Sequence, residues 1–264
     1  MNRPGRVYLS FDFEECDLPR EQGVDFSLAE GMRYSAEGAR AVLDLLDREG
    51  VKATFFTTLN FAERAPEIVR RLVAAGHELA AHGVDHFRPA ADDPEKCRAG
   101  LRRLFPDVEV VGYRQPRMFP VADAALAAAG YRYDSSLNPA CVPGRYCHLS
   151  VPRRPFVRAG ILRIPASVTP ILRFPLFWLS LHLLPERLYH ALARRTLRHD
   201  GRLVVYFHPW EFSSLGERAC ELHLPRLVRP HLGPAMVRRL GRFIGAMRKN
   251  GAEFDIISHM SLEG

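Results

Sequence analysis

The stretch VYLSFDFEECD, residues 7–17, decides the fold into which the rest of the chain has to fit. Side chains alternate between the two faces of a strand, so residues 7–13 predict a strand with one apolar and one polar face. The apolar face carries Val7, Leu9, Phe11 and Phe13. The polar face carries Tyr8, Ser10, Asp12 and, where the strand persists, Glu14. We expect the apolar face to pack against helices and the polar face to look into a barrel.

Four acids stand within residues 10–17, and strand alternation separates them. Asp12 and Glu14 project together at the carboxyl end of the strand, which is the end at which α/β barrels place their chemistry. Glu15 points away from that mouth. We therefore expect Glu15 and Asp17 to be structural, in a turn or as a cap.

Strands and helices alternate along the rest of the chain. Further strands are predicted at 51–59, 77–82, 110–114, 131–136, 202–208 and 253–258, and helices at 35–50, 65–77, 94–104, 120–130, 186–200 and 234–249. This rhythm predicts an α/β fold with a largely parallel sheet, and about seven strands suit a closed or nearly closed barrel. We expect a single domain over 1–264, with an irregular insertion around 138–185.

Composition excludes some classes of protein. The 264 residues carry a net charge of +7, but no run of five or more basic residues marks a nucleic-acid-binding tail. The mild positive charge suits anionic partners such as phosphate groups or a membrane surface, and solubility explains it equally well. The oligomeric state stays open.

The five cysteines are odd in number and include no CxxC, so they form no disulfide framework and favour a reducing compartment. No signal-peptide core and no run of 18 apolar residues occurs, which predicts a cytoplasmic protein without a spanning helix. The nearest approach to a span is 168–185, which Arg173, His182 and prolines interrupt.

The motif HGVDH places His82 and His86 four residues apart, directly after a predicted strand. If the segment is a helical turn, both imidazoles can meet one ion. One carboxylate and two histidines with open coordination positions suit a catalytic divalent metal, and zinc most readily. Glu14 is the candidate carboxylate.

Other polar residues follow further strands. His208 ends the apolar run RLVVYF and is a candidate general acid near its working pKa. The motifs YRQPR and YDSS supply Arg114 and Asp134. Each residue alone is typical of a core or surface position, but five polar sites, each after a strand, together indicate one functional mouth.

In this order, FDFE, HGVDH, YRQPR, YDSS and YFHPW resemble the five motifs of the polysaccharide deacetylases, the NodB-homology group or carbohydrate esterase family 4. The resemblance covers about residues 7–210. It implies a distorted (β/α)7 barrel and metal-dependent removal of an N-acyl group, such as acetyl, from an amino sugar of a cell-surface glycan or its precursor.

The resemblance also implies residue roles. Asp12 matches the catalytic base and His208 the catalytic acid. The divalent metal, Zn²⁺ first and otherwise Co²⁺, Ni²⁺ or Fe²⁺, would be held by Glu14, His82 and His86. Arg114 would orient the base and Asp134 would tune the histidine. Substrate contacts would come from Trp210, Tyr113 and Arg117.

Some features depart from the family pattern. Phe13 separates two acids that are usually adjacent, the second acid is a glutamate, and Gly83 replaces a usual Ser or Thr. The acid-x-acid spacing resembles a branch that includes lipid-linked-sugar deformylases. These departures concern the choice of substrate more than the chemistry.

Three alternatives stay open. The first is a deformylase or deacetylase of a lipid-linked sugar, with peripheral membrane contact through 171–185, where Phe174, Phe177 and Trp178 accompany Arg173. A buried connection covering the barrel explains the same segment. The second is cyclic-amide opening, as in allantoinase-like relatives. The third, from another class, is a catalytically inactive glycan-binding barrel.

Overall fold

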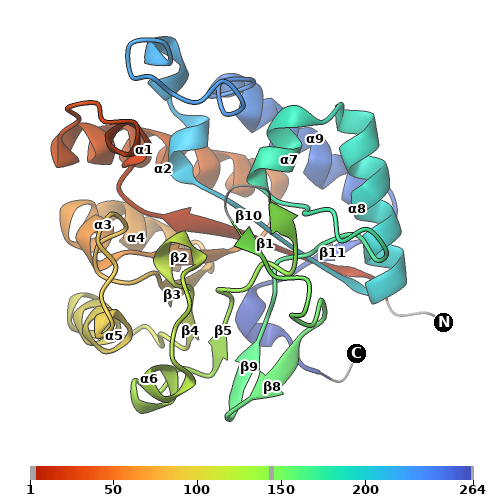
Figure 1. Ribbon diagram of the computed structural model, residues 1–264, viewed down its shortest axis with the longest axis horizontal. Helices are drawn as coiled ribbons and strands as arrows, with labels where there is room; N and C mark the ends of the chain where they lie inside the picture. Colours follow the sequence, from red (N-terminus) through yellow and green to blue (C-terminus); the bar gives the residue numbers. More distant parts are fainter. Residues whose placement is uncertain (1–3, 143–145, 263–264) are drawn as a thin grey trace.

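A curved sheet of mostly parallel strands forms the centre of the computed structural model, which describes residues 4–142 and 146–262 (Figure 1). Its strands are β1 (Arg6–Phe13), β2 (Thr54–Thr57), β3 (Glu78–Ala81), β4 (Gly112–Tyr113), β5 (Tyr133–Asp134), β8 (Phe156–Arg158), β9 (Ile161–Arg163), β10 (Arg202–Phe207) and β11 (Glu253–Phe254). A separate hairpin joins β6 (Cys141–Val142) to β7 (Tyr146–Cys147).

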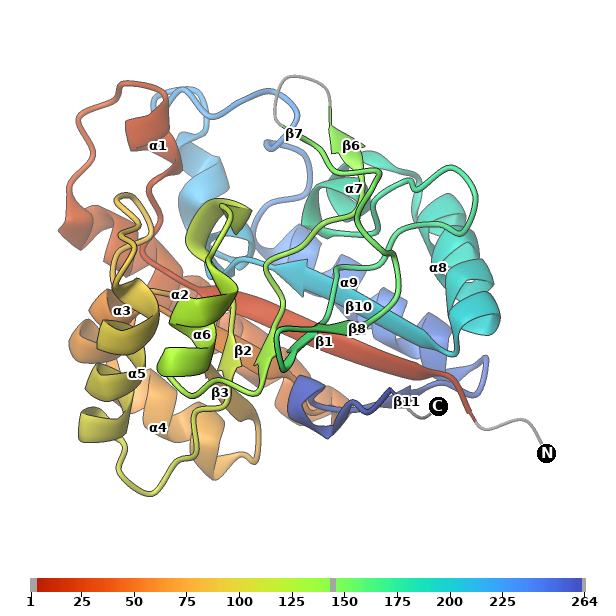
Figure 2. The ribbon, with the colours of Figure 1, turned by 60° about the horizontal axis from the view of Figure 1, so that its bottom comes forward.

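Helices surround this sheet (Figure 2). They are α1 (Leu18–Glu21), α2 (Leu28–Glu49), α3 (Leu59–Arg64), α4 (Pro66–Ala74), α5 (Asp93–Leu104), α6 (Asp123–Ala128), α7 (Trp178–Leu183), α8 (Glu186–Asp200) and α9 (Pro234–Arg248). Short 3-10 turns add η1 (Pro116–Met118), η2 (Pro209–Phe212), η3 (Ser214–Arg218) and η4 (Ile257–His259).

The strand order is β10–β1–β2–β3–β4–β5–β9–β8, and β11 pairs with the start of β1. Every pairing in this sheet is parallel except that of β8 with β9. The curve closes through a loop, because Ser167 accepts from the Val204 amide at 2.8 Å and donates its own amide to the Val204 carbonyl at 2.9 Å. The predicted distorted barrel in one domain is therefore confirmed.

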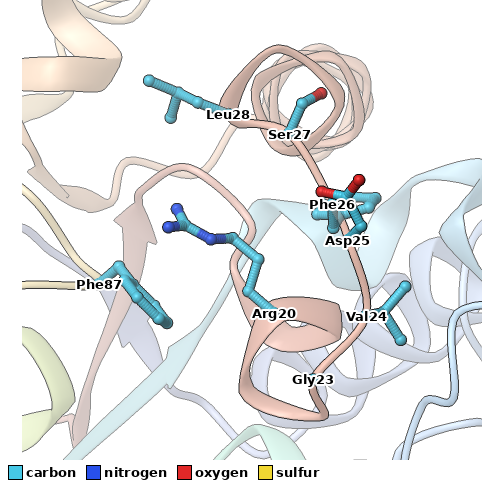
Figure 3. Close-up of a pocket in the computed structure, with 8 residues that line it drawn as sticks. All are labelled: Arg20, Gly23, Val24, Asp25, Phe26, Ser27, Leu28 and Phe87. Carbon is cyan, nitrogen blue, oxygen red and sulfur yellow. The ribbon is translucent and has the colours of Figure 1, made fainter.

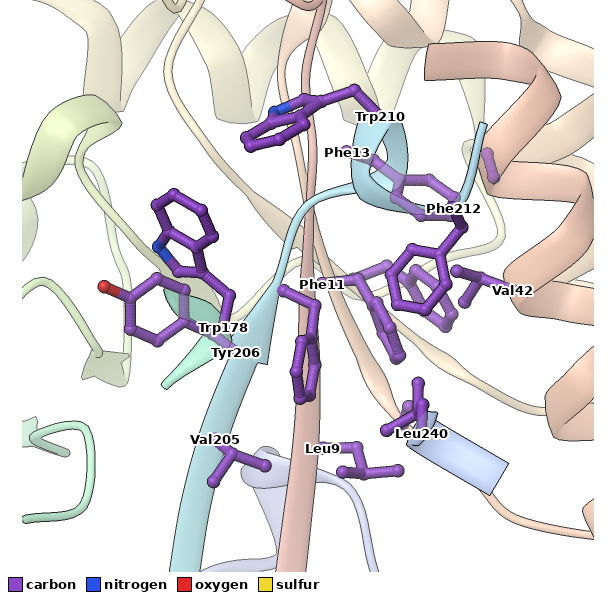
Figure 4. Close-up of a cluster of buried hydrophobic side chains, with 14 of the residues drawn as sticks. Leu9, Phe11, Phe13, Val42, Trp178, Val205, Tyr206, Trp210, Phe212 and Leu240 are labelled. Carbon is purple, nitrogen blue, oxygen red and sulfur yellow. The ribbon is translucent and has the colours of Figure 1, made fainter. Parts of the chain in front are cut away.

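Alternation along β1 builds two cores. The outward residues of β1 join the large cluster under the helices, as predicted (Figure 4). The barrel interior is a smaller cluster of Tyr8, Phe56, Ala80, Val111, Tyr133, Ile164, Val204, Ile257 and Met260. Because this cluster fills the barrel, Ser10 and Asp12, which also face inward, are left near the carboxyl end of β1 as buried polar groups.

Most predicted elements are found, with shorter bounds. The helix predicted at 35–50 is longer than expected, because its N-cap is Ser27, which makes a capping box with Glu30. The HGVDH motif is not a helical turn: Gly83 has φ +75° and the segment is irregular. That φ, and the 2.9 Å that would separate a Cβ from Pro116, explain glycine at this position.

Cysteine spacing gave no sign of the disulfide between Cys141 and Cys147, while Cys16, Cys97 and Cys220 are free. The argument from cysteine usage for a reducing compartment therefore loses its support. Among the described residues, no helix combines the length and the apolar character needed to cross a membrane.

The irregular zone buries some of its apolar residues against the barrel and exposes others. Leu176, Phe177 and Trp178 are buried, which agrees with a covering connection. Ile171 and Leu172 are instead exposed by 79% and 86%. Phe177 and Trp178 thus have no free surface for a membrane.

The packing of α2 on η2 generates a prediction. A Cβ at Gly38 would overlap the carbonyl oxygen of Pro209. Gly38→Ala should lower the free energy of unfolding by about 1–3 kcal/mol or more through overpacking, measured by urea denaturation. The control Gly245→Ala meets open space in α9 and should raise stability by about 0.5–1 kcal/mol. Equal effects of the two substitutions would refute this account of the contact.

Candidate functional site

A fully buried arginine holds the candidate base. Arg114, directly after β4, donates from Nη1 to Asp12 Oδ1 at 2.5 Å. Its other nitrogens donate to Ser10 Oγ at 3.1 Å and to Ser135 O and Oγ at 3.1 and 3.0 Å. The guanidinium carbon lies 4.0 Å from the ring centroid of Phe56. These contacts leave Asp12 Oδ2 facing the two histidines of the mouth, His82 and His208, each with Nε2 at 4.0 Å.

Glu14, His82 and His86 converge on one point. Glu14 Oε2 lies 3.2 Å from His82 Nε2 and 3.0 Å from His86 Nε2, and one ligand atom from each residue lies within 4.8 Å of the others. Ligand atoms bonded to one tetrahedral zinc at about 2.0–2.2 Å are roughly 3.3 Å apart. All three side chains are buried. The spacing and the donor set therefore fit a divalent cation.

Both imidazoles are turned so that Nε2 is free for that cation. His82 Nδ1 lies 2.8 Å from the Arg114 carbonyl, which can only accept, so Nδ1 carries the proton. His86 Nδ1 lies 2.9 Å from Asp17 Oδ2 and donates to this carboxylate. A metal-binding histidine whose other nitrogen is fixed in this way is the usual arrangement.

Glu15 and Asp17, the two acids expected to be structural, support residues 82–86, which we call the histidine loop. Glu15 accepts from the hydroxyl of Thr58 at 2.8 Å and from the amide of His86 at 3.1 Å. Asp17 accepts from Arg117 at 2.6 Å in addition to His86. Glu15 thus points away from the mouth, as predicted, but Asp17 orients a candidate ligand, which the sequence did not indicate.

The candidate acid lies on the other side of Asp12. His208 donates its amide to Glu211 Oε1 at 2.6 Å, and its Nδ1 lies 3.0 Å from the same oxygen. The second oxygen of Glu211 lies 2.9 Å from His182 Nε2. His182 Nδ1 must donate to the carbonyl of Pro230, so one proton is shared between His182 Nε2 and Glu211. Sequence reasoning missed both Glu211 and His182.

Two tryptophans line the site, and Figure 4 shows both among the buried hydrophobic side chains. Trp210 stacks on His208 with ring centroids 5.3 Å apart, and its Nε1 donates to Glu14 Oε1 at 3.4 Å. Trp178, from α7, meets His208 edge-on at 5.2 Å. The irregular zone thereby contributes directly to the site.

Neighbouring charges set the pKa values of the candidate base, Asp12, and the candidate acid, His208. Burial alone would raise the pKa of Asp12, but Arg114 and the histidines outweigh it and hold this pKa below its ordinary value. Burial alone would lower the pKa of His208, but Glu14, Glu211 and Asp12 raise it. An ionised Asp12 therefore faces a histidine that keeps its proton more readily than usual.

Burial likewise opposes the charged form of His86, but Glu14 and Asp17 raise its pKa to about 9. Asp17 behaves in the opposite way: burial would raise its pKa, and His86 and Arg117 lower it. In the metal-free state, a proton therefore occupies His86, and a cation has to displace it.

Two predicted site residues, Asp134 and Tyr113, are placed elsewhere, whereas Arg117 donates to the carbonyl of His86 at 3.1 Å and so supports a candidate ligand. Asp134 bonds to Ser136 and to Arg163 at 2.6 Å, and none of its bonds reaches His208. Burial raises the pKa of Asp134 to about 6. Tyr113 is fully buried in the outer core and donates to Gln115 at 2.6 Å, so it offers a substrate no surface. Arg117 is engaged by Asp17 and Glu21.

A cavity of about 510 Å³ lies beside the histidine loop (Figure 3). Its walls are Arg20, Gly23, Val24, Asp25, Phe26, Ser27, Leu28 and Phe87. The guanidinium carbon of Arg20 lies 4.0 Å from the ring centroid of Phe87. Phe87 follows His86 directly, so the cavity adjoins the candidate metal ligands.

The buried ion pair between Arg114 and Asp12 makes a testable contribution to stability. Arg114→Met should lower the free energy of unfolding of the metal-free protein by about 3–5 kcal/mol, because it leaves the Asp12 charge without its guanidinium. Adding Asp12→Asn should recover part of that loss in a double-mutant cycle. As a control, Arg40→Met breaks an exposed pair with Glu67 and should cost less than about 1 kcal/mol. A double-mutant cycle that shows no coupling energy between Arg114 and Asp12 would contradict the assignment of Arg114 as the partner of the Asp12 charge.

The model of the polysaccharide deacetylase family matches residues 3–127, a range that contains Asp12, Glu14, His82, His86 and Arg114. A chitooligosaccharide deacetylase of Bradyrhizobium sp. (strain ANU 289) is 33% identical over 141 residues, which cover 50% of this chain and 58% of that relative. The matches thus span little more than half the length of the curated relatives.

Two solved structures share the fold. A Mycobacterium smegmatis protein assigned to the polysaccharide deacetylases has a TM-score of 0.66 at 20% identity, over 98% of this chain and 90% of that one. A protein of Bacillus anthracis described as a CE4 family pseudoenzyme has a TM-score of 0.54 at 13% identity, over 97% of this chain and 65% of that one. The family model over residues 3–127 therefore confirms the resemblance to the polysaccharide deacetylase family, and the solved structures share the fold over nearly the whole chain.

Proposed function

We propose that this protein hydrolyses the N-acetyl amide of an amino sugar within a glycan or a glycan precursor, with a divalent cation, zinc first, held by Glu14, His82 and His86. The observation that carries the proposal is the pair of flanking groups. Asp12 Oδ2 lies 4.0 Å from His208 Nε2 and 4.0 Å from Nε2 of His82, one of the three convergent ligands.

The cation would supply Lewis-acid polarisation of the amide carbonyl and a lowered pKa for water. The ligand set suits this purpose because three protein donors leave coordination positions open. The Nδ1 bonds of His82 and His86 direct both Nε2 atoms toward Glu14, so the three donors are preorganised.

Asp12 acts as the base and accepts one proton from the attacking water. Its second oxygen is occupied by Arg114, so only Oδ2 is free to accept. Arg114 keeps Asp12 ionised and fixes its direction, and Ser10 and Ser135 in turn fix Arg114. The water oxygen bonds to the carbonyl carbon.

His208 acts as the acid. Its Nδ1–H is directed to Glu211, so Nε2 carries the transferable proton toward the mouth. That proton goes to the nitrogen as the C–N bond breaks, because an amine leaves poorly without protonation. We assign the tuning of this histidine to Glu211, with His182 behind it, and not to Asp134, whose bonds lie elsewhere.

We place the reacting amide of the glycan at the carboxyl end of β1, beside Asp12 and His208. The tryptophan wall limits the acyl side through Trp178 and Trp210, and we retain Trp210 as a substrate contact. The cavity at Arg20 and Phe87 is a place for a neighbouring sugar (Figure 3). The name of the Bradyrhizobium relative supports an N-acetylated amino sugar.

The second candidate is a glycan-binding barrel without activity. One observation favours this candidate: a solved structure with the same fold is described as a CE4 family pseudoenzyme. Against it stands the full set of base, acid and three donors in this chain.

Substitutions of a candidate ligand and of the candidate base should affect zinc binding and turnover differently. His86→Ala should lose zinc, since it removes one of three donors, whereas Asp12→Asn should keep zinc and lose turnover by about 10²-fold or more. Zinc content by atomic absorption and acetate release from N-acetyl chitooligosaccharides measure the two effects. Full activity in Asp12→Asn would contradict the mechanism. A wild-type protein that stays inactive when loaded with zinc or cobalt would support the glycan-binding barrel without activity.

The assignment of Glu211 has its own test. Glu211→Gln should keep zinc and lower kcat by roughly 10²-fold, because the Nδ1 proton of His208 loses its charged partner. Asp134→Asn, compared per folded molecule, should lower kcat by less than about tenfold. A larger loss in Asp134→Asn than in Glu211→Gln would return the tuning role to Asp134.

A further inference from the structure

A short turn near the rim of the site projects two bare aliphatic side chains. The backbone closes between Thr169 and Phe174, where the Thr169 amide donates to the Phe174 carbonyl and the Phe174 amide to Thr169 Oγ1, both at 2.9 Å. Ile171 and Leu172 at its end are exposed by 79% and 86%. Loop tips are ordinarily polar, so this exposure needs an explanation.

A second loop adds to the same surface. Arg173 Nη1 donates to the carbonyl of Val151 at 2.7 Å and so ties the turn to the loop that carries Leu149, which is also exposed. We define the apolar tip as Leu149, Ile171, Leu172 and Phe174.

The apolar tip is attached firmly to the candidate site. Val168 and Pro175 bridge the base of the turn, and the chain then enters the core at Leu176. Trp178 follows two residues later and touches His208 and Trp210. A surface that holds the tip would therefore lie beside the mouth.

The charge of the surrounding segment is one-sided. Residues 135–185 contain no Asp or Glu, although the chain has 30, and they contain the arginines 145, 153, 154, 158, 163 and 173. Arg173, within the turn, has its side-chain bond to a carbonyl and no acidic partner among the described residues. Arg153 and Arg154 pair with Asp200, Arg158 pairs with Asp123, and the buried Arg163 pairs with Asp134. Among the described arginines of this segment, Arg173 is therefore the one that remains for anionic headgroups beside the exposed aliphatic groups.

We propose that the apolar tip docks the protein on a bilayer that carries anionic lipids, with Ile171 and Leu172 inserted below the headgroups and Arg173 on a lipid phosphate. A second copy of this chain fits the tip less well, because a symmetric contact would bring two Arg173 side chains, neither with an acidic partner among the described residues, close together. The docking does not depend on the proposed activity. Its consequence, that the amino sugar is presented on a lipid carrier, rests on the proposed function.

Vesicle flotation of the full-length protein tests the docking. Wild-type protein should float with vesicles of phosphatidylcholine and phosphatidylglycerol, and less with phosphatidylcholine alone or in high salt, since screening weakens the arginine contacts. Ile171→Glu/Leu172→Glu should reduce the bound fraction at least tenfold. Both residues are exposed, so circular dichroism and thermal unfolding should match those of wild type.

Leu227→Glu/Leu262→Glu is the matched control, since it changes two leucines exposed by 59% and 48% and adds the same charge outside the apolar tip. It should float nearly as well as wild type. Zinc content should be equal in all three proteins, which separates this test from that of the proposed function.

Three outcomes would overturn the proposal. Wild-type protein that stays with the soluble fraction contradicts docking, and equal flotation of the tip variant and wild type shows that the tip is not responsible. A wild-type dimer in light scattering that the tip variant converts to a monomer, without vesicle binding, would make the tip an interface between copies.

Discussion

The buried guanidinium of Arg114 is the interaction on which the rest of the site depends. It joins β1, β4 and the segment after β5 through Asp12, Ser10 and Ser135, and its backbone carbonyl turns His82. A cation with no exposed surface persists only when its donors are paired and a carboxylate balances its charge. One residue thus sets the ionisation of the proposed base and the tautomer of a proposed ligand.

The four acids after β1 differ because each meets a different partner. Asp12 meets a guanidinium, Glu14 meets two imidazole Nε2 atoms, and Asp17 meets the Nδ1 atom of His86. Glu15 holds the backbone of the histidine loop. A short acidic run can therefore supply a base, a ligand and two supports, since neighbouring side chains leave a strand end in different directions.

Much of the fold could be predicted from local pattern. Alternation in β1 separated Asp12 and Glu14 from Glu15, and strand–helix rhythm predicted the barrel. The role of Glu211 could not be predicted, because it depends on His182, 29 positions away on a helix that had no clear periodicity. The geometry of HGVDH was misread for a similar reason. Its irregular shape is imposed by Glu15 and Asp17, not by local helix preference.

The central claim is that Glu14, His82 and His86 hold one divalent cation between Asp12 and His208. Crystals of the zinc-loaded protein, measured above and below the zinc absorption edge, test it most directly. The account predicts one strong anomalous peak about 2.0–2.2 Å from Glu14 Oε2 and from the Nε2 atoms of both histidines. A zinc peak at another cluster, or none at these three atoms in crystals shown to contain zinc, would contradict it.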